Sequence, residues 1–268
     1  MATSEIESRT SKQYWEDYWD DEQSAQMLGP IVRNPKDKQS EALYLPFDKF
    51  LSKMNFNSIL EIGGAPGRFT AYFGNRYNSK IGILDFSDIG LQEAQHFLQI
   101  HTKNRFELYK KDLFKDSLDD VPLYDIVYSL GFVEHFENLR LSVEKHLALA
   151  KPKGLVIIGV PVLLGINKWL ASNLAPQNLA THYTMIMDRR NWAFIEEIPN
   201  VEIVFNKYVG GFLPQMHHRL ENPIFVNKVI YKLLHGVFRR IYKFMPYKDK
   251  VNSKYWSYYY YVVIKKLK

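Results

Sequence analysis

One stretch of this sequence combines an acid with a glycine-rich turn in a way that could bind a ligand. An apolar run ends at Glu61, the turn Gly63-Gly64-Ala65-Pro66-Gly67 follows, and a helical pattern begins at Phe69. Glycines let backbone N–H groups approach a ligand closely, because no Cβ intervenes. The helix that follows points its partially positive N-terminus at the same place. This order predicts the strand, turn and helix that open a nucleotide-binding βαβ unit. A carboxylate facing the turn suits a ligand with a positively charged amino group.

A second acid ends the next apolar run. Residues Lys80 to Asp85 are typical of a short strand, and Asp85 lies 22 residues beyond Gly63. That offset is close to the one at which an acidic side chain meets a ribose diol. An acid at a strand end can also be a simple turn residue, but its pairing with the glycine turn favours a ligand role. Ser87 then begins a helix as its N-cap.

Two histidines are candidates for acid–base chemistry. His135 follows Glu134 directly after a predicted strand, Tyr124 to Leu130, and His182 lies further along the chain. Histidine titrates near neutral pH, so either side chain could accept a proton from an acceptor hydroxyl. A purely structural, hydrogen-bonded role is the alternative for each.

These stretches together resemble the class I S-adenosylmethionine-dependent methyltransferases of the small-molecule, ubiquinone-biosynthesis-like type. The turn resembles their first motif, acid-x-Gly-x-Gly-x-Gly, with Ala65 in place of the middle glycine, and Glu134-His135-Phe136 resembles their motif after the fourth strand. The resemblance covers about residues 55–210 and 255–268. It implies S-adenosylmethionine as cofactor and transfer of its methyl group, by in-line displacement, to a small or a lipid- or sugar-linked acceptor. The cofactor-binding residues that it implies are Glu61, Gly63, Gly64, Ala65, Gly67, Asp85, Phe86, Asp112, Leu113, Ser129 and Leu130, with Asp112 at the adenine amine.

The sequence departs from one subgroup of that family at a single position. In the metal-dependent ubiquinone O-methyltransferases, another Glu precedes the Glu-His pair by three residues, and here that position is Gly131. Carboxylate oxygens are the ligands that Mg²⁺ prefers. With one carboxylate fewer, the sequence predicts no metal site.

Strands alternate with helices along most of the chain, which predicts an α/β fold with a mostly parallel sheet covered on both faces. The resemblance implies a Rossmann-like, seven-stranded sheet whose last strand is antiparallel. Helical insertions are expected after the fifth strand and between the sixth and seventh. The expected organisation is an N-terminal helical arm or lid over 1–54 and a methyltransferase domain over 55–268. That domain includes a substrate-cover insertion over 161–187 and a basic amphipathic insertion over 212–254.

Aromatic residues cluster near the N-terminus. Tyr14, Trp15, Tyr18 and Trp19 form one face of a predicted helix. Such a face can simply pack an N-terminal arm onto the domain, or it can form a lid over the cofactor. A second helix is expected over Phe47–Met54, beginning after Pro46.

The positive charge is concentrated at the C-terminal end of the chain. The whole chain carries +6, whereas residues 225–268 hold eleven Lys or Arg and one acid, 11 − 1 = +10. An apolar stripe and a basic flank share a predicted helix within 223–245. This helix either packs on the domain with a solvated charged face or docks on an anionic membrane surface. The polar, acidic N-terminus and the absence of cysteine favour a cytoplasmic protein, peripheral at the inner face of a membrane if the helix docks.

Three other functions share some of these features. A nicotinamide-dependent oxidoreductase would use the glycine turn and Asp85, but it gives no role to Glu61, Asp112 or Glu134-His135. A nucleic-acid (RNA) methyltransferase would explain the basicity. It is disfavoured, because the chain has neither an Asn-Pro-Pro-aromatic signature nor a catalytic cysteine. A non-catalytic scaffold would not need an intact cofactor pocket. The acceptor is therefore expected to be a small molecule, such as a sugar, an isoprenoid or a lipid-linked compound.

Overall fold

A computed structural model gives the fold of the 268-residue chain. The structure describes residues 7–20, 29–33, 38–211 and 251–268, and single helical positions between 229 and 244. Most of the predicted insertion over 212–254 lies outside the described residues, which include only those helical positions and residues 251–254.

The core of the molecule is a seven-stranded sheet with the strand order β3-β2-β1-β4-β5-β7-β6. All neighbouring pairs from β3 to β5 are parallel, and β7 is antiparallel to both β5 and β6. The predicted sheet, including its antiparallel last strand, is confirmed. The strands are β1 (Ser58–Ile62), β2 (Lys80–Asp85), β3 (Phe106–Lys110), β4 (Tyr124–Leu130), β5 (Ala150–Pro161), β6 (Val201–Val209) and β7 (Tyr259–Lys266).

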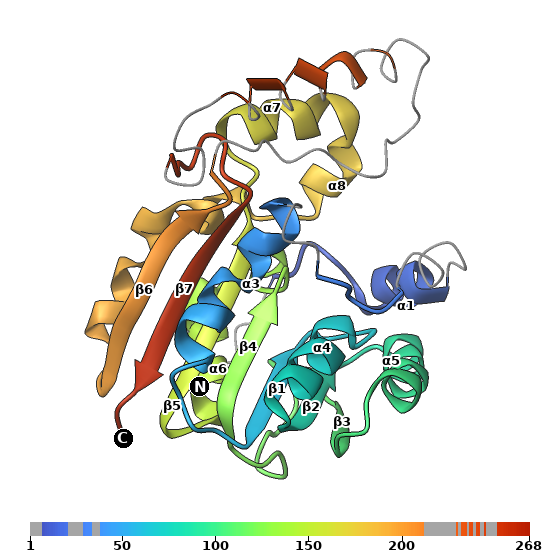
Figure 1. Ribbon diagram of the computed structural model, residues 1–268, viewed down its shortest axis with the longest axis vertical. Helices are drawn as coiled ribbons and strands as arrows, with labels where there is room; N and C mark the ends of the chain where they lie inside the picture. Colours follow the sequence, from blue (N-terminus) through green and yellow to red (C-terminus); the bar gives the residue numbers. More distant parts are fainter. Residues whose placement is uncertain are drawn as a thin grey trace.

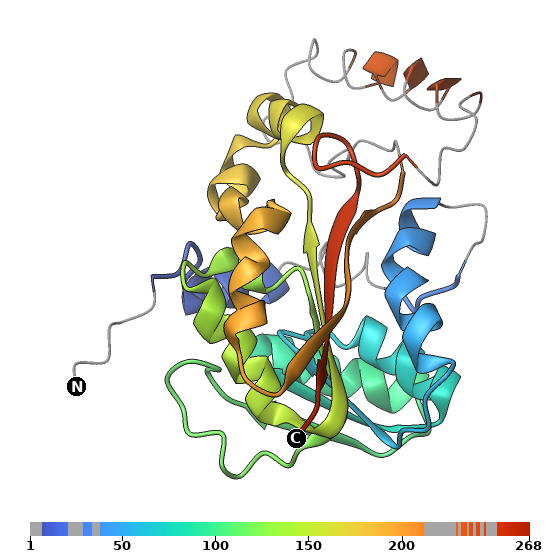
Figure 2. The same ribbon diagram turned by 90° about the vertical axis from the view of Figure 1, so that its left-hand side faces the viewer.

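Helices cover both faces of the sheet (Figures 1 and 2). Successive strand residues point to opposite faces, so Ile59 joins one buried apolar cluster and Leu60 the other. The Ile59 side is covered by α3 (Lys38–Leu51), α4 (Arg68–Tyr77) and α5 (Asp88–His101). The Leu60 side is covered by α6 (Leu139–Leu149) and the 3₁₀ segment η3 (Arg189–Glu197).

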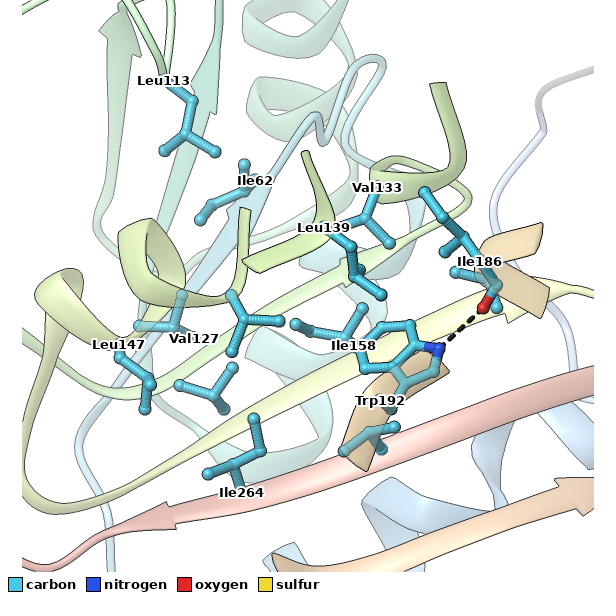
Figure 3. Packing of buried hydrophobic residues seen from close by; sticks show 14 of the residues in the cluster. Ile62, Leu113, Val127, Val133, Leu139, Leu147, Ile158, Ile186, Trp192 and Ile264 are labelled. Carbon is cyan, nitrogen blue, oxygen red and sulfur yellow. Dashed lines mark hydrogen bonds between the residues drawn. The ribbon is translucent and has the colours of Figure 1, made fainter. Parts of the chain in front are cut away.

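Trp192 is central to the packing on the second face (Figure 3). Its indole is fully buried, and the indole N–H donates to the carbonyl oxygen of Ile186 at 2.6 Å. Its buried neighbours in the figure include Val133, Leu139 and Ile158. Because a buried indole N–H needs an acceptor, this bond fixes η3 against the short 3₁₀ helix η2 (Thr184–Met187).

Several elements gather at the carboxyl ends of the parallel strands. They are the N-terminal helix α1 (Lys12–Asp20), the 3₁₀ turn η1 (Val133–His135), and α7 (Gly165–Leu174) and α8 (Pro176–Ala180) after β5. Helical positions between 229 and 244 lie beside α7, where Leu234 packs against Leu170 and Leu174. Among the described residues, no helix has the length and apolar content needed to cross a membrane.

Some element boundaries differ from the sequence predictions. The helix expected to begin after Pro46 instead begins at Lys38 and contains Pro46. Burial of Tyr44, Pro46 and Phe47 in the core, together with the Arg33–Glu41 ion pair at 2.7 Å, holds the earlier turns in place. The 3₁₀ segment η3 begins directly after Asp188, whose carboxylate caps it by accepting from the backbone N–H of Arg190.

Candidate active site

A pocket opens at the carboxyl ends of β1, β2 and β4, where the strand order reverses between β1 and β4. Parallel α/β sheets bind ligands in the crevice at such a switch point. The cavity, including its open mouth, has a volume of about 610 Å³. Its lining comes from the glycine turn, the ends of β2 and β4, the segment after β3, and helix α1. The lining residues are Trp15, Trp19, Gly63, Leu84, Asp85, Phe86, Lys111, Asp112, Leu113, Phe114, Gly131, Phe132, His135 and Phe136.

The glycine turn passes over the side chain of Glu61. A Cβ at Gly64 would lie 2.8 Å from Cγ of Glu61, so this path needs a glycine. The Glu61 carboxyl is fully buried beneath the turn. It accepts hydrogen bonds from the Tyr128 hydroxyl at 2.7 Å and from the Thr70 hydroxyl. In this position Glu61 supports the turn from below rather than lining the pocket.

Glu61 should make the stability of the folded protein depend on pH. Burial raises its pKa from 4.5 to about 7, so folding favours the protonated carboxyl. This contribution is complete below about pH 4.5 and is lost as the pH rises through about 7. A shift of this size is equivalent to about 3 kcal/mol. Glu61→Gln removes the titration but keeps an oxygen acceptor. Between about pH 5 and about pH 8, we therefore expect the unfolding free energy of the native protein to fall by about 2–3 kcal/mol more than that of the variant.

Urea unfolding of the native protein and of Glu61→Gln at the two pH values measures this difference. Glu202→Gln, an exposed position on β6, serves as the surface control for exchanging a carboxyl for an amide. Equal pH dependence in the native protein and Glu61→Gln would show that Glu61 does not titrate in this range.

Asp85 joins the end of β2 to the glycine turn and to the start of α5. Its carboxylate accepts from the backbone N–H of Ala65 at 3.3 Å and of Ser87 at 3.0 Å. Asp85 is 8% exposed, and burial raises its pKa. Ser87 is the N-cap of α5, as predicted, because its hydroxyl accepts from the N–H of Gly90. Asp85 therefore stands at the pocket wall with its carboxylate already oriented by the backbone.

The segment after β3 forms another wall of the pocket. Asp112 accepts from the backbone N–H of Phe114 at 3.0 Å, which orders the turn there, and Leu113 is buried beside it. Phe132 lies close to the glycine turn, since a Cβ at Gly63 would be 2.3 Å from its ring. These contacts give the pocket an apolar lining with a few carboxylates, the usual composition of a small-molecule site.

Helix α1 closes one side of the pocket with two tryptophans. Trp15 and Trp19 line the cavity, and the Trp15 ring meets the His135 ring edge-on at 5.2 Å between centroids. The helix is held by Glu16, whose carboxylate accepts from the backbone N–H groups of Asp88 at 2.8 Å and Ile89 at 2.9 Å. Burial alone would raise the pKa of Glu16, but these bonds and one from Ser87 lower it. Glu16 thus caps the N-terminus of α5 and joins α1 to the Asp85 side of the pocket.

Loss of that carboxylate should loosen α1. Hydrogen bonds to a charged group contribute about 1.5–3 kcal/mol, so Glu16→Ala is expected to weaken S-adenosylhomocysteine binding by at least about tenfold. Calorimetric titration measures the affinity. Asp17→Asn on the same helix is the control, because its carboxylate bonds only to exposed Gln13 among the described residues. An unchanged affinity in Glu16→Ala would mean that α1 takes no part in binding.

The two histidines lie side by side beyond the end of β4. The His135 and His182 ring centroids are 4.7 Å apart, and Nδ1 of His135 donates to the carbonyl oxygen of Thr181 at 2.8 Å. Burial, and then proximity to His182, lower the pKa of His135 to about 3, so its imidazole is neutral at physiological pH. The neighbouring Glu134 is 1% exposed, and burial raises its pKa to about 8.

The predicted site residues divide into two groups in the structure. The turn, the end of β2, the segment after β3 and η1 each contribute to the lining, through Gly63, Asp85, Phe86, Asp112, Leu113 and His135. The other predicted residues do not line the cavity, and their contacts with a cofactor stay predictions. They are Glu61, Gly64, Ala65, Gly67, Ser129, Leu130 and His182.

Ser129 illustrates the second group. It is buried, and its hydroxyl donates to Nε2 of His146 at 2.9 Å. This bond follows from the Nδ1 hydrogen bond of His146 to the Ser142 carbonyl oxygen, which leaves Nε2 as the acceptor. Phe114 and Phe132 also line the pocket, although neither was predicted as a site residue. An aromatic residue next to a predicted ligand position was the only signal for them.

Comparison with known proteins agrees with this geometry. Residues 60–156 match a family model described as a methyltransferase domain. No curated protein sequence matches the chain.

Solved structures of low sequence identity share the fold. The plantazolicin methyltransferase BpumL, in complex with a pentazolic desmethylPZN analog and SAH, is 14% identical, with 96% of both chains covered and a TM-score of 0.54. The N-methyltransferase NodS from Bradyrhizobium japonicum WM9, in complex with SAH, is 13% identical, with 96% of this chain and 98% of that chain covered and a TM-score of 0.53. The magnesium protoporphyrin IX methyltransferase ChlM from Synechocystis PCC 6803, with bound SAH, is 11% identical, with 96% and 100% covered and a TM-score of 0.56.

The family match begins within β1 and ends within β5, and the shared fold extends over nearly the whole chain. Neither observation favours a nicotinamide-dependent oxidoreductase. Residues 60–156 thus match a methyltransferase domain, and the chain shares its fold with solved methyltransferases that hold SAH.

Proposed function

We propose that the protein transfers the methyl group of S-adenosylmethionine to a small acceptor bound beside η1. The observation that carries the proposal is the pocket at the strand-order reversal, lined by two of the three predicted carboxylates, Asp85 and Asp112. Asp85 suits the ribose diol and Asp112 the adenine amine. The mouth of the pocket, with Trp15 and His135, then receives the acceptor. The SAH bound in the similar solved structures supports S-adenosylmethionine as the cofactor.

Methyl transfer depends mainly on how the acceptor is positioned against the methyl group. The sulfonium of S-adenosylmethionine is strongly electrophilic, so an acceptor held in line with the S–CH₃ bond can displace it directly. The acceptor atom forms the new bond to carbon while the sulfur keeps the electron pair, leaving S-adenosylhomocysteine. His135 is neutral and lines the pocket, so its imidazole can accept a hydrogen bond from an acceptor hydroxyl. His182 supports it from behind.

The pocket mouth favours an acceptor with apolar surface. Phe132 and Phe136 form an aromatic wall, with ring centroids 4.9 Å apart, next to His135. The insertion after β5 borders the same place, because α8 leads directly into Thr181 and His182. A sugar, an isoprenoid or a lipid-linked compound fits a wall of this kind, and an amphiphilic acceptor fits best.

We further propose that helical positions between 229 and 244 dock on an anionic membrane at the inner face, where a lipid-linked acceptor would be found. Leu234 packs inward on α7, whereas five apolar side chains on the same helix are exposed, Phe244 most of all at 77%. Trp169 of α7 is 56% exposed nearby, and Lys232 and Arg240 are exposed cations of the same helix. The combination of apolar and basic exposed residues suits a lipid surface. The five exposed apolar residues are Val229, Leu233, Val237, Ile241 and Phe244.

The acceptor can be found with labelled cofactor. The protein is incubated with S-adenosylmethionine carrying a deuterated methyl group and with sets of sugars, sugar nucleotides, isoprenoid alcohols and their phosphates. Mass spectrometry then finds the product that has gained the label. We expect labelling of an amphiphilic acceptor. Labelling of RNA alone would contradict a small-molecule acceptor.

Membrane docking is tested separately by sedimentation with vesicles containing phosphatidylserine. Leu233→Ser with Phe244→Ser, and Lys232→Gln with Arg240→Gln, should each reduce the bound fraction several-fold. Ile100→Ser, an exposed apolar position on α5, is the control. If the native protein stays in the supernatant, or both double variants bind as it does, the helix has another role.

A further inference from the structure

Glu134, His135 and His182 come together from two separate segments of the chain. One carboxylate oxygen of Glu134 and one ring nitrogen of each histidine lie within 4.8 Å of one another. Glu134 and His135 belong to η1, and His182 follows α8. The sequence analysis predicted no metal because position 131 is a glycine. His182 is 48 residues beyond Glu134, outside the sequence neighbourhood of the Glu-His pair.

Glu134 is the unusual member of this group. Its side chain is buried, and both carboxylate oxygens lack a hydrogen-bond partner among the described residues. A buried carboxylate without a partner is costly, and native proteins almost always satisfy such groups. A cation bound between Glu134 and the histidines would satisfy the carboxylate.

Backbone contacts hold the three side chains in place. Nδ1 of His135 donates to the Thr181 carbonyl oxygen at 2.8 Å, and Nδ1 of His182 donates to the Asn178 carbonyl oxygen at 2.7 Å. These bonds fix the orientation of each ring. Metal-binding histidines are commonly oriented in this way, by a carbonyl on the other ring nitrogen. The backbone N–H of Tyr183 also donates to the Glu134 carbonyl oxygen at 2.7 Å, which joins the two segments directly.

We propose that Glu134, His135 and His182 bind a divalent transition-metal cation of the zinc type at the acceptor end of the pocket. Two imidazole nitrogens and one carboxylate are the donor set of catalytic zinc sites that keep a position open, and they suit Mg²⁺ poorly. In a tetrahedral zinc site the ligand atoms are about 3.3 Å apart, so the three atoms must approach one another by roughly 1.5 Å. His182 is only partly buried and can make most of that movement.

The position of this site gives the cation a role in the proposed function, on which this step rests. His135 lines the pocket, so the open position would face the acceptor. A cation there would bind an acceptor oxygen and lower its pKa, and the proton would leave to solvent before methyl transfer. His135 and His182 would then act on the acceptor through the metal instead of as bases. Binding of the cation itself does not depend on the methyltransferase activity.

Direct metal titration tests the proposal. The full chain is freed of metal with a chelator, transferred to metal-free buffer and titrated with Zn²⁺, with Mg²⁺ and, followed by visible absorption, with Co²⁺. We expect one equivalent of Zn²⁺ or Co²⁺ to bind and Mg²⁺ to bind at least 100-fold more weakly. Glu134→Gln and His182→Asn should each weaken Zn²⁺ binding at least 100-fold. His96→Asn, which removes an exposed histidine of α5, should bind like the native protein.

The outcomes separate this proposal from the proposed function. S-adenosylhomocysteine titration of each variant reports whether the fold and the cofactor pocket are intact. If Glu134→Gln does not fold, Zn²⁺ binding by His182→Asn decides the test, because His182 is partly exposed. No stoichiometric Zn²⁺ binding by the native protein, or equal binding by the native protein and His182→Asn, overturns the metal site. Zn²⁺ binding without S-adenosylhomocysteine binding would leave the metal site standing and overturn the proposed function.

Discussion

Asp85→Ala is expected to weaken S-adenosylhomocysteine binding by about 100-fold. In the proposed complex the carboxylate accepts two hydrogen bonds from the ribose diol, and bonds to a charged group contribute about 1.5–3 kcal/mol. Asp85 is already oriented by the N–H groups of Ala65 and Ser87, so little ordering is needed when the ligand binds. The alanine variant also releases the turn at Ala65, which adds to the loss. Calorimetric titration gives the two dissociation constants.

Two further variants make this result specific. Asp85→Asn keeps the size of the side chain and one oxygen acceptor, so we expect an intermediate affinity. Asp119→Ala removes an exposed carboxylate that bonds only to Ser117 among the described residues, and it should bind like the native protein. If Asp85→Ala folds with a native melting temperature and binds the ligand as tightly as the native protein, Asp85 is not at the ribose.

Gly63→Ala is expected to abolish cofactor binding. Gly63 has a φ of +65°, where a side chain is strained, and its Cβ would lie 2.3 Å from the Phe132 ring. Phe132 cannot yield without entering the pocket, because both residues line it. The substitution therefore moves either the turn or the pocket wall, and we expect the affinity for S-adenosylhomocysteine to fall by more than about 100-fold, equivalent to about 3 kcal/mol.

Gly29→Ala is the matched control for this substitution. A Cβ at Gly29 has nothing within 4 Å, so the variant should bind and melt like the native protein. Phe132→Ala combined with Gly63→Ala tests the cause, since removing the ring removes the clash. Partial recovery of binding in the double variant supports a steric origin. Normal binding by Gly63→Ala alone would place the cofactor away from the turn.

Much of the fold could be predicted because local signals and burial agree along most of the sheet. The run Lys80–Asp85 forms β2 with the predicted limits, and Ser87 caps α5 as its residue type suggests. The predictions were weaker where distant contacts decide. Pro46 lies inside α3, because residues on either side of it are held in the core and by ion pairs to Arg33.

The candidate site shows the same limit. Spacing along the sequence placed Gly63 and Asp85 at one pocket, because the carboxyl ends of parallel strands meet. It could not show that Tyr128, 67 residues from Glu61, would engage that carboxylate. Nor could it show that His182 would lie against His135, because the chain between them runs through α6, β5, α7 and α8, and distant contacts decide how these elements are arranged.

Titration of the native protein with S-adenosylhomocysteine and, separately, with NADH tests the central claim most directly. The account predicts one S-adenosylhomocysteine per chain, with a dissociation constant on the order of micromolar, and no heat from NADH. Binding of NADH without S-adenosylhomocysteine would contradict the assignment of the pocket and with it the proposed methyl transfer.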